Sequence, residues 1–226
     1  MTPPISLSRA GVADHLSDTQ ADEMRHAWAT RQFIVFPGFL NRQLLDFVEA
    51  ATRDRTFSPN HHPASGMEQR LEDNAGIALL DFLMNDPGLI RRVEQLTSTP
   101  RIGWFHGRIY KLTPGTDEAH DWHGDHLTDR EIGVSINLSA QPFEGGLLQL
   151  RHVATQAPIG EFANVGRGDC VLFRLGDDVE HRVLPVTGTV PRVAFAGWFY
   201  SGATILERFA ALSRSADGVS PSNPRK

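Results

Sequence analysis

The heptapeptide HDWHGDH, residues 120–126, gathers three histidines and two aspartates around one tryptophan. In an extended segment residues i and i+2 point to the same side, so His123 and Asp125 can reach one ion while Gly124 leaves space between them. Imidazole nitrogens and carboxylate oxygens are ligands for divalent transition metals. On its own, however, this spacing fits a solvated turn better than a metal site.

A third candidate ligand, His181, begins a strand-like run far along the chain, HRVLPV. Two imidazoles and one carboxylate can occupy one face of an octahedron around non-haem Fe(II), which leaves three positions open for oxygen chemistry. A structural zinc site would instead close a tetrahedron with four ligands, usually including cysteine. Because the chain has a single cysteine, Cys170, the pattern favours a catalytic iron site.

Arg192 follows in the run RVAFAGWFY, where strand alternation places it on one face with Ala194 and Ala196. A guanidinium with small neighbours is suited to bidentate pairing with a carboxylate, such as the distal carboxylate of a dicarboxylic cosubstrate. Taken alone, Arg192 would fit a surface strand residue.

Together these positions form a pattern of His-any-Asp, a distant His and an Arg about ten residues beyond it. With this pattern the chain resembles the Fe(II)- and 2-oxoglutarate-dependent dioxygenases, particularly the prolyl-4-hydroxylase-like branch. The resemblance covers roughly residues 101–200, from YKLTPGTDEAHDWHGDH through VSINLSAQPFEGGLLQLRH to VPRVAFAGWF. It implies a double-stranded β-helix, a jelly roll with the metal between its two sheets, and a tight hairpin at Gly145-Gly146 between two strands.

The resemblance implies Fe(II) bound by His123, Asp125 and His181, and 2-oxoglutarate bound by Arg192, with ascorbate as the reductant that keeps the iron ferrous. Tyr110 resembles a tyrosine of the family that binds a 2-oxoglutarate carboxylate. Asn137 fits a cofactor-binding position in the pocket and a strand edge equally well. The roles of several other polar residues stay open between ligand support, substrate contact and surface positions: His106, Arg108, His120, Asp121, His126 and Arg174.

The reaction that the resemblance implies is hydroxylation of an unactivated C–H bond in a small molecule, an amino acid or a peptidyl substrate, with release of succinate and CO2. Desaturation, ring closure and demethylation need the same ligands. Two other classes remain open. One is a cupin-like metal protein without 2-oxoglutarate chemistry, in which Arg192 is structural; the other is a non-catalytic β-sandwich that binds a peptide or protein.

The predicted elements that position these residues are mainly helices before residue 100 and strands after it. Capping residues and apolar periodicity predict helices near 18–31, across 41–54, and two more within 76–97 broken near Asp86-Pro87-Gly88. The run from residue 32 fits a short buried strand that ends at Pro37-Gly38, and 55–72 fit a loop that either covers the site or lies on the surface. After Pro100, short β-type runs predict a mainly β domain with flanking helices, in which the N-terminal helices pack against one sheet.

Length and composition set the remaining limits. The 226 residues predict a single domain over 1–212, with a helical part over 18–98, a jelly-roll core over about 100–200 and a disordered tail over 213–226. A net charge of −5 gives no reason to expect nucleic acid or a membrane surface as a partner. A cytoplasmic location is expected because a secretory leader, a membrane span and a disulfide pair are all lacking, and oligomeric state is not indicated.

Overall fold

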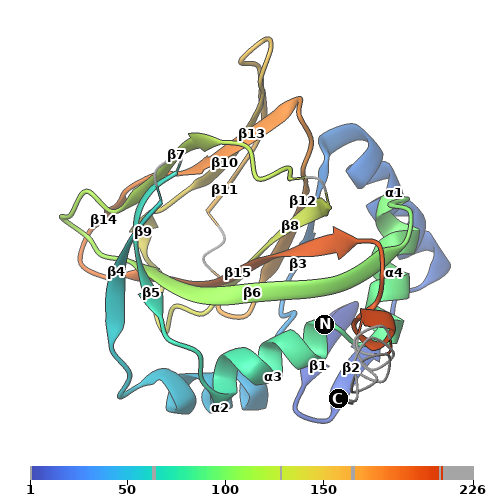
Figure 1. Cartoon of the computed structure of the whole chain (residues 1–226), viewed down its shortest axis with the longest axis horizontal. Helices are drawn as coiled ribbons and strands as arrows, with labels where there is room; N and C mark the ends of the chain where they lie inside the picture. The colour runs from blue at the N-terminus through green and yellow to red at the C-terminus, as the bar shows by residue number, and fades with distance from the viewer. Residues whose placement is uncertain (1, 63–64, 128, 164–165, 209, 211–226) are drawn as a thin grey trace, which may run out of the picture.

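Most of the molecule is built from β-strands, which form where short runs are rich in β-branched and aromatic residues (Figure 1). The computed structural model describes residues 2–62, 65–127, 129–163, 166–208 and 210. Its strands are β1 (Ile5–Ser8), β2 (Gly11–Asp14), β3 (Phe33–Phe36), β4 (Phe57–His62), β5 (Gly66–Leu71), β6 (Ile102–Leu112), β7 (Ala119–His123), β8 (Arg130–Asn137), β9 (Glu144–Gly145), β10 (Leu148–His152), β11 (Pro158–Phe162), β12 (Cys170–Arg174), β13 (Val179–Val183), β14 (Val186–Thr187) and β15 (Arg192–Ser201).

One antiparallel sheet curls over on itself and confirms the predicted jelly roll. One half has the order β11-β10-β13-β7, and the other has the order β6-β15-β8-β12-β3. Strand β5 joins the halves because its first residues pair with β7 and its last residues with β6. At this crossing a Cβ on Gly66 would meet the Ala119 carbonyl oxygen at 2.5 Å, so only glycine lets the two backbones approach so closely.

Four helices form where the sequence supplies caps: α1 (Asp18–Arg31), α2 (Arg42–Thr52), α3 (Ala75–Met84) and α4 (Pro87–Thr97). Ser17 caps α1 through a capping box with Gln20, and Asp86 caps α4 ahead of Pro87. Helices α3 and α4 pack against β6, on the side of the sheet that faces away from the interior of the roll (Figure 1). The predicted helices and their packing against one sheet are thus confirmed.

Two apolar cores follow from strand alternation. Phe105, Ile109, Phe195 and Phe199 point from β6 and β15 toward the helices and are essentially fully buried there. The opposite faces of the same strands contribute to a second cluster between the two halves of the sheet, which includes Ala194. Full burial of each large apolar side chain contributes about 1.5–3 kcal/mol. The two cores fix β6 and β15 on both faces, which makes them rigid supports for side chains in the interior.

Two sequence predictions about connections are wrong. The predicted loop at 55–72 is instead the hairpin β4–β5, which pairs along its described length and carries β5 into the main sheet. Gly145-Gly146 does not close a hairpin, because β8 and β10 lie in different halves of the sheet. Both glycines have positive φ, and a Cβ on Gly146 would meet the Arg192 Cδ at 2.9 Å. This glycine therefore makes room for a buried arginine.

The sequence analysis also missed strands β1, β2 and β11 and the short strands β9 and β14. Of the residues that the structure describes, no helix is both long and apolar enough to cross a membrane. The tail predicted to be disordered, 213–226, lies outside the described residues.

Candidate active site

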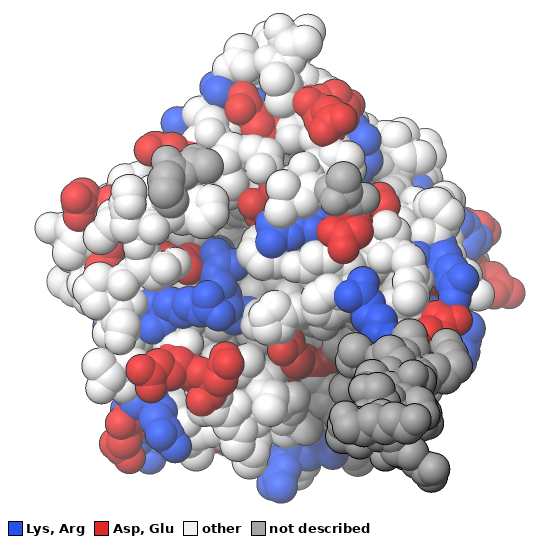
Figure 2. Space-filling view, viewed as in Figure 1, with Lys and Arg blue, Asp and Glu red and all other residues white. Residues whose placement is uncertain are grey.

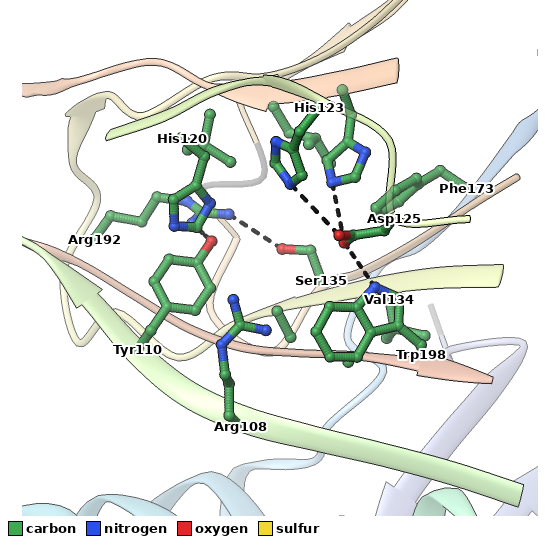
Figure 3. Close-up of a pocket in the computed structure, with 15 residues that line it drawn as sticks. Arg108, Tyr110, His120, His123, Asp125, Val134, Ser135, Phe173, Arg192 and Trp198 are labelled. Atoms are coloured by element: carbon green, nitrogen blue, oxygen red, sulfur yellow. Dashed lines mark hydrogen bonds and ion pairs between the residues drawn. The ribbon is translucent and has the colours of Figure 1, made fainter. Parts of the chain in front are cut away.

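Two neighbouring strands bring the three candidate metal ligands together. His123 ends β7 and His181 lies in the middle of β13, where the two residues are direct antiparallel partners. Asp125 follows two residues after His123, and its carboxylate oxygens lie 3.7 Å from His123 Nε2 and 3.5 Å from His181 Nε2 (Figure 3). One ligand atom from each of the three residues lies within 4.8 Å of the others. This donor set fits a divalent transition metal.

The protonation states of two of these residues also suit metal binding. Burial and the neighbouring His181 lower the pKa of His123 to about 4, so its imidazole is neutral near pH 7. Its Nδ1–H donates to the Asp121 carbonyl oxygen at 2.6 Å, which leaves Nε2 as the free donor atom. Burial acts to raise the pKa of Asp125, but contacts with His181, His123 and Trp198 outweigh it and hold the pKa below its ordinary value.

The other members of the heptapeptide point elsewhere. His126 Nδ1 pairs with Asp177 at 2.9 Å, and His120 Nε2 pairs with Glu68 at 3.0 Å. Trp122 lies against the guanidiniums of Arg151 and Arg182, on the opposite side from His123. Among its described residues, the heptapeptide therefore brings only His123 and Asp125 to His181.

Arg192, the first residue of β15, is 2% exposed and points into the same cavity. Its guanidinium donates to the Tyr110 hydroxyl and, at 3.1 Å, to Ser135 Oγ (Figure 3). Within the described chain it has no carboxylate at ion-pair distance. A buried cation whose hydrogen bonds go only to hydroxyl groups is costly, so the geometry leaves a place for an acidic ligand.

A buried ion cluster on the cavity wall was missed by the sequence analysis. The Glu68 carboxylate, on β5, accepts from Arg108 Nε at 2.8 Å, from Arg108 Nη2 at 3.0 Å and from His120 Nε2–H. Burial acts to raise the pKa of Glu68, but the hydrogen bonds from His120 and Arg108 outweigh it and hold the pKa below its ordinary value. Burial lowers the pKa of His120, which fits a neutral ring that donates from Nε2.

Replacing Glu68 by Gln should destabilise the fold, because it leaves the Arg108 guanidinium half-buried without a counter-charge. We expect a loss of about 3 kcal/mol in the free energy of unfolding at pH 7, measured by urea denaturation. Since the pKa of Glu68 is lowered on folding, its contribution is fully present above its ordinary pKa of 4.5 and is lost as the pH falls below that value. The difference between wild type and variant should therefore be equal at pH 7 and pH 6. Glu23→Gln, on the exposed face of α1, is the control, and an equal effect of both changes would contradict this role.

Trp198 was also missed, although one further step of the β15 alternation reaches it. Its Nε1–H donates to Asp125 Oδ2 at 2.7 Å and orients the carboxylate toward the two imidazoles (Figure 3). Two predicted candidates lie outside the cavity. Asn137 is buried at the end of β8, where its amide oxygen accepts from the Ser139 backbone N–H. Arg174 pairs with Asp178 near the surface.

The cavity has two compartments that meet at the candidate metal ligands. The inner one is closed by Arg192, Tyr110 and apolar side chains of the two sheet halves, among them Leu148 and Phe173. The outer one has a volume of about 330 Å³ and polar walls that include residues of the β4–β5 hairpin. His123, Asp125 and Trp198 line both. The candidate metal ligands therefore lie between a small inner space beside Arg192, of about 40 Å³, and the larger outer compartment.

Comparison with known proteins agrees with this geometry. Residues 106–200 match the profile of the family described as the 2OG-Fe(II) oxygenase superfamily. Comparison with curated proteins gave no sequence match.

Similar solved structures share the jelly roll at low sequence identity. A prolyl-4-hydroxylase from Pseudomonas putida is 20% identical, with a TM-score of 0.60 over 81% of this chain and 100% of that one. A prolyl hydroxylase from Trichoplax adhaerens, in complex with a hypoxia inducible factor peptide fragment, is 18% identical, with a TM-score of 0.61 over 86% and 93%. The non-haem α-ketoglutarate dependent epimerase SnoN from nogalamycin biosynthesis is 12% identical, with a TM-score of 0.59 over 82% and 84%.

Fold and site thus define a jelly-roll domain with a candidate His-Asp-His metal centre. Residues 106–200 match the 2OG-Fe(II) oxygenase superfamily, in agreement with the predicted resemblance. This match and the His-Asp-His group support an oxidoreductase with the expected Fe(II) and 2-oxoglutarate.

Proposed function

We propose that this protein hydroxylates an unactivated C–H bond of a small molecule, an amino acid or a peptidyl substrate. In this proposal His123, Asp125 and His181 hold Fe(II), while Arg192 and Tyr110 hold the distal carboxylate of 2-oxoglutarate. The observation that carries it is the buried Arg192 guanidinium, which has no carboxylate partner in the described chain and faces the same cavity as the three candidate ligands. An anionic cosubstrate would supply the missing counter-charge.

The bound metal, 2-oxoglutarate and O2 together supply the oxidant, with one oxygen atom leaving in succinate as CO2 is lost and the other entering the substrate C–H bond. The chain's own residues bind and orient. The planar guanidinium of Arg192 fixes the cosubstrate by two parallel hydrogen bonds. Trp198 holds the Asp125 carboxylate through its Nε1–H. Leu148 and Phe173 keep water from the inner compartment, which strengthens the ion pair there.

Hydroxylation is the proposed outcome because prolyl hydroxylases are among the similar structures, which is support by analogy of fold. The epimerase among them has the same fold, so the outcome depends on how the substrate is placed above the metal. Asp125 supports oxygen transfer over halogen transfer, since its carboxylate would fill the coordination position that a halide needs.

The test is a substrate screen scored by succinate formation, with purified protein, Fe(II), ascorbate and 2-oxoglutarate. We expect at least one compound to raise succinate formation above the rate without it, and mass spectrometry of that compound to show a gain of one oxygen atom. A 2-oxoglutarate titration of Mn(II)-loaded protein, followed by calorimetry, gives a result that does not depend on the substrate. If the protein binds the metal but neither binds 2-oxoglutarate nor forms succinate, it is a cupin-like metal protein. If it binds no metal at all, it is a binding module.

A further inference from the structure

The face of β6 and β15 that lines the cavity carries a row of alternating guanidiniums and aromatic rings. Arg108 lies 5.5 Å from the Tyr110 ring centre and 5.1 Å from that of Trp198. Arg130, from the neighbouring strand β8, lies 3.9 Å from the Trp198 ring and 5.7 Å from the Tyr200 ring. The row runs from the inner compartment to the wall of the outer one, and each ring face holds a cation in place.

Arg108 and Arg130, the two arginines of this row, differ in how their charge is balanced. Arg108 makes two hydrogen bonds to Glu68 and is neutralised by them. Arg130 Nη1 approaches Asp125 Oδ1 only to 3.9 Å, beyond hydrogen-bond distance. The buried Nε–H of Arg130 has no acceptor among the described residues. Arg130 therefore faces Asp125 only at the outer limit of ion-pair distance and without a hydrogen bond, at a side chain that is 21% exposed.

Asp125 cannot serve as the lasting partner of Arg130. Its Oδ2 already accepts from Trp198, and both of its oxygens face the imidazoles of His123 and His181. In the proposed function its negative charge is directed to the metal. Arg130 then presents a cation to the outer compartment directly beside the reaction site.

A second cation lines the same compartment from the other side. Arg70, on β5, is exposed and belongs to the wall formed by the β4–β5 hairpin. Figure 2 shows a group of Lys and Arg side chains beside a hollow left of the middle of the face toward the viewer, with Asp and Glu side chains close by. The chain as a whole carries a net charge of −5, so this positive lining is a local feature of the cavity. Such a lining attracts anions.

We propose that the substrate is a small carboxylic acid whose carboxylate pairs with Arg130, an inference that rests on the proposed function and specifies its substrate. The planar guanidinium matches a carboxylate through two parallel hydrogen bonds, and its contacts with the Trp198 and Tyr200 rings hold it in place beside the compartment. The compartment volume of about 330 Å³ is at the lower end of the range for small-molecule sites, which suits a compound the size of an amino acid.

The test compares carboxylic acids with their uncharged amides as stimulators of succinate formation. The probes are the proteinogenic amino acids, linear dicarboxylic acids and aromatic acids, each beside its amide and, where one exists, its phosphonate analogue. We expect at least one acid to stimulate wild-type protein about tenfold more strongly than its amide. Arg130→Met should remove this preference by raising the apparent KM for the acid, and Arg130→Lys should restore part of it. Arg174→Met, which removes an arginine outside the cavity, should keep the wild-type preference.

A merely structural role of Arg130 would lower all rates alike and leave the ratio of acid to amide unchanged, which would overturn the proposal. It is also overturned if no acid stimulates, if amides or neutral peptides stimulate as well as acids, or if phosphonates are preferred. Calorimetry of 2-oxoglutarate with Mn(II)-loaded wild-type protein distinguishes a failure of this inference from a failure of the proposed function. Cosubstrate binding without any response to acids rejects this inference alone, whereas loss of both rejects the proposed function.

Discussion

Alanine at position 123, 125 or 181 should lower substrate-dependent succinate formation about a thousandfold or more, since each change removes one of the three proposed metal ligands. The His123 and His181 side chains meet as direct partners on β7 and β13, and Asp125 lies between them and Trp198. No other described His, Cys, Asp or Glu forms a comparable cluster that could replace a lost ligand. Metal content after gel filtration in Fe(II), and succinate formation, are the two measurements.

The control for this experiment is His126→Ala in the same segment. His126 pairs with the exposed Asp177, so its loss should change the rate by less than about threefold and leave the metal content unchanged. Circular dichroism and thermal unfolding should show that all four variants are folded, because the ligands lie in the cavity and outside both apolar cores. Near-wild-type activity in two of the three ligand variants would show that the metal is bound elsewhere.

The parts of the fold that could be predicted from the sequence are those in which local signals agree. Helix α1 begins at a capping box, α4 begins at Asp86-Pro87, and β15 alternates apolar and cavity-facing residues over its whole length. The hairpin β4–β5 could not be predicted because FSPNHH and GMEQRL lack regular alternation and include Pro, Asn and Gly. These residues are strands because β5 finds partners on both sides, in β6 and β7, which lie far along the chain.

The same division holds for the candidate site. The three candidate metal ligands and Arg192 could be found because their types and spacing together are specific, and Tyr110 because it resembles a tyrosine of the family; all five line one cavity. Glu68 could not be found, since a single glutamate in a polar segment carries no sign of burial until Arg108 and His120 are brought to it. The place of Arg130 in the cavity wall could not be predicted either, because it depends on the contact with the Trp198 ring and on the distance to Asp125.

Arg192 offers the second large effect, because 2-oxoglutarate affinity and apo-protein stability should respond to it differently. Arg192→Met removes the proposed carboxylate partner and should weaken 2-oxoglutarate binding to Mn(II)-loaded protein about a hundredfold. Arg192→Lys keeps the charge but loses the planar fork, and should weaken binding about tenfold.

The unfolding temperature of the apo-protein shows whether Arg192 binds a ligand or stabilises the fold. Its guanidinium is 2% exposed and bonded only to the hydroxyls of Tyr110 and Ser135 in the described structure, so methionine of similar length relieves a buried charge. The apo-protein of Arg192→Met should therefore unfold at the same temperature as wild type or higher, whereas 2-oxoglutarate should raise the unfolding temperature of wild type alone. Arg182→Met, on the outer side of β13 over Trp122, should keep the response to 2-oxoglutarate. A less stable Arg192→Met with unchanged 2-oxoglutarate affinity would make Arg192 a structural residue and move the anchor to Arg108, the next arginine along the cavity wall.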